Sequence, residues 1–167
     1  MSLVRDIQKE VNLRLLEESI PRIIQCLNTI DEGHIWHKPN SHSNSIGNLI
    51  LHLCGNVRQY LISSVGGQED KRNRDQEFND CGLSRNQLTN KLNELSEDIK
   101  ASIPSITKKE LKRARSVQGF NMTGISVVIH VIEHFSYHTG QIAYMTKLLK
   151  DVDLKFYGDM DLNVTGE

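Results

Sequence analysis

Residues 130–149 read HVIEHFSYHTGQIAYMTKLL, and this stretch decides the fold that the sequence predicts. Its apolar residues recur with the period of an α-helix, and three histidines stand at a spacing of four. Positions four apart lie on one face, because an α-helix has about 3.6 residues per turn. Imidazoles are costly to bury without partners, so the pattern predicts a compensating ligand. A divalent metal is the economical candidate, since two imidazoles placed in this way can bind one ion.

Length and composition are those of one globular domain, residues 1–167, with a sizeable core. Charged residues make up 25% of the chain and hydrophobic residues 38%, which excludes a disordered protein. The formal net charge is −1 and no basic face stands out, which argues against nucleic-acid binding. No segment approaches the roughly 20 apolar residues of a membrane span, and no signal peptide is recognisable. We therefore expect a cytoplasmic protein without a membrane segment.

The cysteines Cys26, Cys54 and Cys81 predict neither a disulfide framework nor a thiolate zinc site, because their number is odd and no CxxC occurs. We expect all three to be reduced and structural. A nucleophilic Cys54 is the alternative. It lies two residues after His52, about 200° around a helix and hence on the opposite face.

Hydrophobic periodicity predicts an all-α protein built as a four-helix bundle. The predicted helices cover residues 2–30, 45–64, 84–101 and 123–150, with Ser43 as an alternative start of the second. Pro21 should kink the first helix or restart it. Segment 66–83 is glycine-bounded and charged, which predicts a long loop, and segment 151–167 has no strong period. The long connection between the last two helices permits a crossover topology.

The second predicted helix carries a polar stripe among its leucines. His52 lies in the middle of it, with Asn48 and Asn56 one turn to either side. Such a stripe is expensive to bury unless it lines a cavity or a site. We therefore predict His52 as a third metal ligand beside His134 and His138. Three imidazole nitrogens suit Zn, Ni, Cu, Co or Fe, and do not suit Mg or Ca.

Other side chains are candidates for supporting roles. Metal-bound imidazoles are oriented by hydrogen-bonding neighbours, and the candidates for that role are Asn48, Asn56, Tyr137 and Gln141. The cations that could bind an anionic thiol cofactor or a substrate carboxylate are Arg58, Arg72 and Arg74. The alternative for these arginines is a solvated charged surface. Trp36 either walls the mouth of a pocket or anchors its loop.

A rival register uses His130, Glu133 and His134, which spell H-x-x-E-H, the inverted zinc-peptidase motif. Glu133 would then be a general base, and His130 would replace His138 as a ligand. The motif needs a further ligand from downstream. The available carboxylates there are Asp151, Asp153, Asp159, Asp161 and Glu167.

Four segments together resemble the DinB/YfiT-type superfamily of small bacterial metalloproteins. The segments are IWHKPN (35–40), NSIGNLILHLCGNVRQYLIS (44–63), KRNRDQEF (71–78) and HVIEHFSYHTGQIAYMTKLL (130–149). The resemblance implies a four-helix bundle with up-down-down-up wiring and one divalent metal on three histidines. Mapped onto this sequence, those histidines are His52, His134 and His138, which disfavours the rival register. Characterised members of the superfamily include S-transferases and isomerases that use bacillithiol, mycothiol or glutathione, and dimers are common.

These patterns and the resemblance lead to one expectation about function. We expect a metal-dependent enzyme, with Zn or Ni as its ion, acting as a thiol S-transferase on small electrophiles or as a hydrolase. A low-molecular-weight thiol would be the second cofactor, the substrate a small molecule, and the assembly a homodimer. The alternatives are a non-catalytic metal-binding dimer linked to stress and a protein whose core histidines bind no metal.

Overall fold

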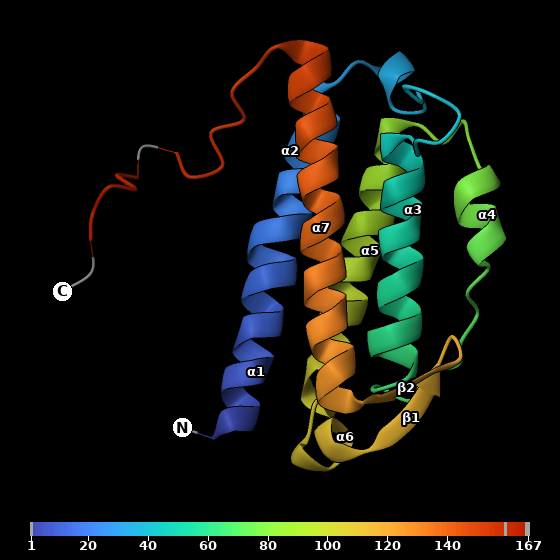
Figure 1. Ribbon diagram of the computed structural model, residues 1–167, viewed down its shortest axis with the longest axis vertical. Coiled ribbons are helices and arrows are strands. Elements are labelled where there is room, and N and C mark those ends of the chain that lie inside the picture. Colours follow the sequence, from blue (N-terminus) through green and yellow to red (C-terminus); the bar gives the residue numbers. More distant parts are fainter. Residues whose placement is uncertain (1, 159, 166–167) are drawn as a thin grey trace.

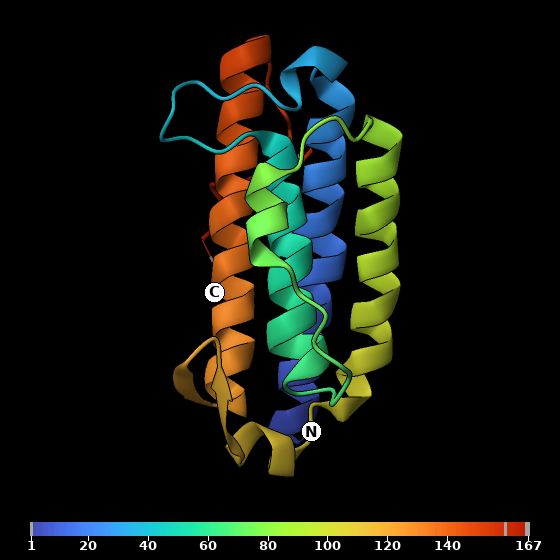
Figure 2. The same ribbon diagram turned by 90° about the vertical axis from the view of Figure 1, so that its right-hand side faces the viewer.

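Four long helical rods lie side by side in the computed structural model, which describes residues 2–158 and 160–165 (Figures 1 and 2). The first rod is continuous through α1 (Leu3–Val11), a π-helical segment (Asn12–Ser19) and α2 (Ile20–Thr29). The second joins α3 (Ile46–Val57) to a π-helical segment (Arg58–Ser63), the third is α5 (Arg85–Ser102), and the fourth is α7 (Gly124–Lys150). Figure 1 shows the first and fourth rods running upwards from the N-terminal end, and the other two running downwards.

Two connections hold shorter elements. Between the second and third rods lies α4 (Arg74–Asn79), which packs on α3 (Figure 2). Between α5 and α7 lie a 3₁₀ turn (Ile103–Ser105), α6 (Lys108–Lys112) and the strands β1 (Ala114–Val117) and β2 (Phe120–Thr123). A further 3₁₀ turn (Glu32–His34) follows α2. No helix in the described part of the chain is long and apolar enough to cross a membrane.

Side-chain caps begin the helices where the sequence predicts them. Ser45 accepts a hydrogen bond from the Asn48 backbone N–H, and Thr123 accepts one from the Ser126 N–H. Ser84 and Gln87 form a capping box at the start of α5. Each such cap satisfies an orphan N–H of a first turn and contributes about 1 kcal/mol. These caps fix the residues at which α3, α5 and α7 begin.

The core lies between the rods and is mainly aliphatic, with Phe135 and Tyr60 among its buried aromatic side chains. Every rod contributes fully buried side chains, among them Leu15, Leu27, Leu53, Leu61, Leu92, Phe135 and Ile142. Burying one such side chain stabilises the fold by about 1.5–3 kcal/mol. This packing holds α3 and α7 next to each other, and the polar residues between the two helices can therefore contact one another.

The structure is mostly helical, as predicted, and differs from the prediction in two connections. Segment 66–83 is not wholly a loop, because Asn73 caps α4 and Glu77 of that helix is buried. Residues 114–123 form an antiparallel hairpin in which Val117 pairs with Phe120 across a tight turn. Both residues of that turn, Gln118 and Gly119, have positive φ, which is the geometry of a two-residue hairpin loop. Strands of four residues are too short to show alternation in the sequence.

Pro21 does not interrupt the first rod, because the backbone at Ser19 and Ile20 is helical. It lies in the first turn of α2, directly after the π-helical segment. A proline inside a continuous helix removes one hydrogen bond, and here the change from π-helical to α-helical bonding occurs beside it.

Trp36 anchors the loop that enters α3. Its indole Nε1 donates to the Leu83 carbonyl at 2.9 Å, and its ring lies flat against Gly47. A Cβ at Gly47 would lie 2.6 Å from the indole ring. The glycine therefore lets the loop close onto the helix.

We expect Gly47→Ala to lower the free energy of unfolding by about 1–3 kcal/mol, because a methyl group would overpack this contact. Gly140→Ala is the matched control, since that glycine lies on α7 and a Cβ there meets nothing within 4 Å. The control should keep the stability or raise it by up to about 1 kcal/mol. Urea unfolding measures both variants, and equal losses would contradict this account of Trp36.

Candidate metal centre

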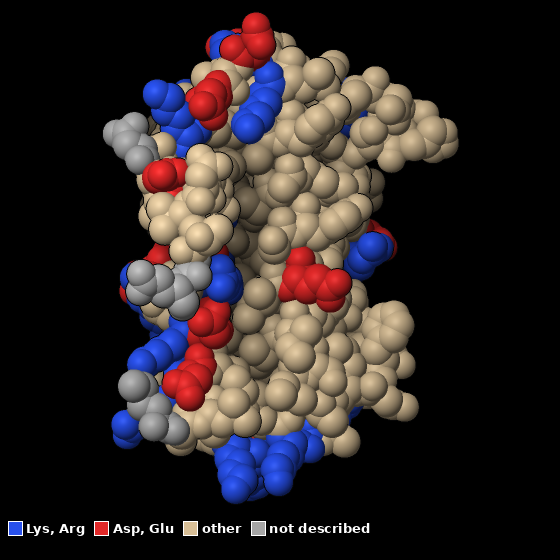
Figure 3. All heavy atoms as spheres, turned by 60° about the vertical axis from the view of Figure 1, so that its left-hand side comes forward, with Lys and Arg blue, Asp and Glu red and all other residues tan. Residues whose placement is uncertain are grey.

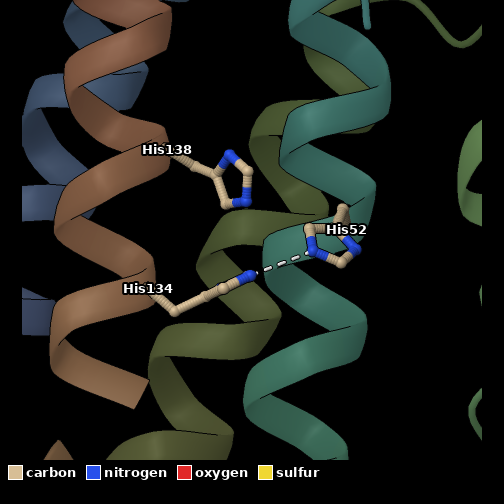
Figure 4. Close-up of side chains that lie close together, drawn as sticks. All are labelled: His52, His134 and His138. Atoms are coloured by element: carbon tan, nitrogen blue, oxygen red, sulfur yellow. Dashed lines mark hydrogen bonds between the residues drawn. The ribbon is translucent and has the colours of Figure 1, made fainter. Parts of the chain in front are cut away.

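Three imidazoles meet between α3 and α7, two rods that run in opposite directions (Figure 4). His52 comes from α3, and His134 and His138 come from successive turns of α7. The Nε2 atoms of His52 and His134 are 3.1 Å apart, and one nitrogen from each of the three rings lies within 4.8 Å of the others. These residues, called the imidazole cluster below, are the three that the sequence predicts as ligands.

The imidazole cluster fits a transition-metal ion. Zinc–nitrogen bonds of about 2.0–2.1 Å place two tetrahedral ligands about 3.3 Å apart. The His52–His134 separation of 3.1 Å is already close to that value, and a small movement of His138 would bring in the third nitrogen. The Nδ1 atom of His134 is buried and has no hydrogen-bond partner, so this ring, unlike the other two, is not oriented by a second hydrogen bond.

The protein keeps the His134 and His138 rings neutral. Burial and the neighbouring His138 and His52 rings together lower the pKa of His134 to about 3. Burial also lowers the pKa of His138, although its hydrogen bond to Gln141 opposes the shift. A metal binds only the unprotonated nitrogen of histidine, so the half-buried rings are in the state that a metal needs.

Two of the predicted supporting residues hold His138. The side-chain oxygen of Gln141 accepts a hydrogen bond from His138 Nδ1 at 2.6 Å. The amide of Gln141 in turn donates to the Tyr137 hydroxyl at 3.2 Å. Because an amide oxygen only accepts, Nδ1 of His138 carries the proton and Nε2 keeps its lone pair.

Glu77 holds His52, and sequence reasoning missed it. Its carboxylate oxygen Oε2 lies 2.9 Å from His52 Nδ1, and Glu77 is 7% exposed. Burial raises the pKa of Glu77, but hydrogen bonds from Arg72 and His52 outweigh it and leave that pKa below its usual value. The carboxylate is therefore ionised. The sequence feature that could have indicated Glu77 is Asn73, a helix-capping residue within segment 66–83, because it begins the helix that carries Glu77.

The two asparagines of the polar stripe do not contact the imidazole cluster through any observed hydrogen bond. Asn48 donates to the backbone carbonyls of Glu77 and Asp80, both at 3.0 Å, and so fastens α4 to α3. Asn56 lies 3.5 Å from His130 Nε2, and its own side-chain oxygen is buried without a partner. Asn48 thus acts on the site through α4, and Asn56 lies one turn from it.

The three predicted arginines lie in different surroundings. Arg72 is engaged with Glu77, and its side chain is 2% exposed. Arg58 pairs with Asp98 of α5 at 3.0 Å. Arg74 is exposed and lies over the Phe78 ring at 5.0 Å, and that ring lies 4.9 Å from the His52 ring. Of the three, Arg74 is the cation left accessible beside the imidazoles.

The rival register is not the group of nitrogens that converges. The His130 ring lies 5.3 Å from the His134 ring between centroids, but it packs on the Tyr60 ring at 4.5 Å, and Glu133 is exposed. The structure groups His134 with His52 and His138 instead. Of the downstream carboxylates, Asp151, Asp153 and Asp161 are exposed, and Asp159 and Glu167 lie outside the described residues.

The cysteines are free thiols, as predicted. Burial raises the pKa of Cys54 to about 11, so it is a poor nucleophile. Cys54 lines a cavity of about 450 Å³ together with Arg58, Asp98 and Lys91, and none of the three histidines of the imidazole cluster lines it.

Comparison with known proteins identifies the family and the fold. Residues 9–158 match the family described as a protein of unknown function (DUF1572). The chain belongs to this family. A DinB-like protein (YjoA) from Bacillus subtilis has a similar structure, with a TM-score of 0.67 and 18% sequence identity over 91% of this chain and 96% of that one. At that identity the similarity shows the fold. No curated protein matches this DUF1572 member.

We expect His52→Ala, His134→Ala and His138→Ala each to weaken zinc binding by more than about 100-fold, since loss of a supporting residue alone costs about 10–100-fold. His130→Ala should bind zinc like the wild type, at about one ion per chain. Competition with a chromophoric chelator gives the affinities. Loss of binding in the His130 variant with retention in the His138 variant would restore the inverted peptidase motif.

Proposed function

We propose that this DUF1572 protein is a divalent-metal-dependent enzyme whose ion, zinc or nickel, is held by His52, His134 and His138. The observation that supports this most directly is the convergence of the three nitrogens within 4.8 Å. Three protein ligands leave a fourth position for water or substrate, which is typical of catalytic rather than structural zinc. We further propose one domain over residues 1–167 with up-down-down-up wiring, which the directions of the rods in Figure 1 support. A cytoplasmic location stays a prediction from the sequence.

The proposed reaction is transfer of a low-molecular-weight thiol, of the bacillithiol, mycothiol or glutathione type, to a small electrophile. A divalent ion on three neutral imidazoles would lower the pKa of a thiol or water bound to it. Gln141 and Glu77 would keep the ligand nitrogens of His138 and His52 directed at that ion. Hydrolysis would use the same site with water in place of the thiol.

Arg74 is the residue that we propose for binding a carboxylate of a bacillithiol- or glutathione-type thiol. It is exposed and is placed beside the His52 ring through its contact with Phe78. A guanidinium binds a carboxylate through two parallel hydrogen bonds. Arg58 and Arg72, the other two candidates, already bind carboxylates of the protein itself.

A non-catalytic metal-binding protein is the second candidate. The observation that favours it is the position of the 450 Å³ cavity, whose lining includes Glu77 but no histidine of the imidazole cluster. A substrate in that cavity would be separated from the ion by the Arg72 and Glu77 side chains.

We also propose a homodimer formed through the outer face of α7. Between Gly124 and Thr146 this helix has a single charged residue, Glu133. Its exposed apolar or aromatic side chains are Ile125, Ile129, Tyr137, Tyr144 and Leu148. Figure 3 shows a broad area with few charged side chains on this side of the molecule. Extended apolar patches of this kind commonly mark protein–protein interfaces.

For the reaction, the zinc- or nickel-loaded protein should consume one of the three thiols in the presence of a small electrophile such as a halogenated aromatic compound or an epoxide. Removing the metal with a chelator should abolish turnover, and restoring it should restore turnover. Arg74→Ala should raise KM for the thiol with little change in kcat, because it removes a binding contact remote from the reacting sulfur. A metal-loaded protein that turns over no thiol and hydrolyses no ester would favour the binding-protein candidate.

For the assembly, we expect Tyr144→Glu to convert the dimer into a monomer, because a charge would be desolvated at the centre of the interface. Leu3→Glu is the control, since Leu3 is 72% exposed on α1. Sedimentation velocity reads both variants. A wild-type protein that sediments as a monomer at micromolar concentration would refute the interface.

A further inference from the structure

We propose that the ion pair between Arg72 and Glu77, seated on Gly55, is a built-in device that fixes His52 in the tautomer able to bind a metal. Glu77 and Arg72 are thus positioning residues, although neither would touch the ion. This inference rests on the proposed metal site, but its central observation can be made on the metal-free protein.

The first step is the proton on His52. Nδ1 of His52 lies 2.9 Å from Glu77 Oε2, and an ionised carboxylate can only accept a hydrogen bond. Nδ1 therefore carries the proton, and Nε2 presents its lone pair to His134. Arg72 Nη2 lies 3.2 Å from the same Nδ1, but a guanidinium only donates, so it acts on His52 through the carboxylate.

The second step is the fixed position of the carboxylate. Arg72 donates from Nε to Oε1 of Glu77 at 2.6 Å and from Nη2 to Oε2 at 2.8 Å. Its third nitrogen, Nη1, donates to the Gln59 side-chain oxygen at 2.9 Å. The side chains of Arg72 and Glu77 are 2% and 8% exposed. Such a two-bond pair holds a carboxylate in one orientation, and removing one partner of a buried pair is costly.

The third step is the surface on which the pair rests. Gly55 lies three residues after His52 on α3, and a Cβ there would overlap Glu77 Oε1 and lie 2.7 Å from Glu77 Cδ. Asn48, four residues before His52, donates to the carbonyls of Glu77 and Asp80 and holds α4 against the same helix. One face of α3 thus carries the ligand, the space for its acceptor and the anchor of the helix that brings that acceptor.

The fourth step is the contrast with the other ligands. His138 is preset in the same way by Gln141 Oε1. His134 is not, because its Nδ1 has no partner. In the metal-free protein, His134 Nε2 must therefore donate to His52 Nε2 across the observed 3.1 Å. On metal binding that proton leaves His134 Nε2, and Nδ1 takes one up from solvent, so His134 changes tautomer while His52 and His138 keep theirs.

The experiment is ¹⁵N NMR of the histidine rings, with and without zinc, alongside zinc affinity measured by chelator competition. In the metal-free wild type, His52 and His138 should be protonated on Nδ1 and His134 on Nε2, and zinc should move only the His134 proton. Glu77→Gln should lower the fraction of His52 rings protonated on Nδ1, because the charged acceptor of that proton is lost. The same variant should bind zinc about 10–100-fold more weakly. Gly55→Ala, which displaces the carboxylate, should weaken binding in the same direction.

Asp75→Asn is the matched control, because Asp75 is an exposed carboxylate on the same helix as Glu77. It should leave both readouts unchanged. A metal-free wild type with His52 protonated on Nε2 would overturn the inference, and this test needs no variant to fold. A Glu77→Gln protein that behaves like Asp75→Asn would overturn it as well. If the wild type fails to bind zinc or nickel, the proposed function fails, while the tautomer of His52 still decides the inference.

Discussion

The rest of the structure depends on one constraint, the burial of polar side chains between two antiparallel apolar helices. Because α3 and α7 run in opposite directions, His52 lies opposite His134, and Asn56, one turn further along α3, lies opposite His130, one turn earlier on α7. Imidazoles and amides in such a seam stabilise the fold only if each finds a partner. The partner of His52 comes from the connection that holds α4, and the partner of His138 comes from α7 itself, whereas His134 Nδ1 and Asn56 Oδ1 are buried without one.

α4 shows how a connection supplies such a partner. Its six residues could not form a stable helix alone, because an isolated helix of that length does not compensate the cost of nucleation. It persists because Asn73 caps it, Asn48 of α3 binds its C-terminal carbonyls, and Glu77 joins the buried ion pair. The same contacts bring a carboxylate to His52. The contacts that fold α4 are therefore the same contacts that place Glu77 beside His52.

The sequence predicted what local periodicity and capping determine. The four rods and their capping residues follow from patterns within each segment. His52 could be predicted because burying a polar side chain among leucines costs free energy unless the side chain has a partner. Glu77 was not found, since its partner is 25 residues away and its segment has no apolar period. The high charge of segment 66–83 favours a solvent-exposed loop, whereas the structure buries Arg72 of this segment against Glu77. Pairings between distant charges cannot be read from composition.

The ion pair of Arg72 with Glu77 also limits where a substrate can bind. Because the Arg72 guanidinium donates to Glu77 and Gln59, it has no free pair of N–H groups to bind an anionic ligand. Moving Arg72 away would leave the buried Glu77 carboxylate without its ion-pair partner next to His52. Recognition must then use other side chains near the imidazole cluster. Phe78 contacts the His52 ring, Tyr137 contacts the His138 ring, and Arg74 lies over Phe78. Together these three residues offer two aromatic rings, a hydroxyl and a guanidinium. An electrophile with an apolar body and a thiol with a carboxylate both suit these groups, and neither needs the cavity behind Glu77.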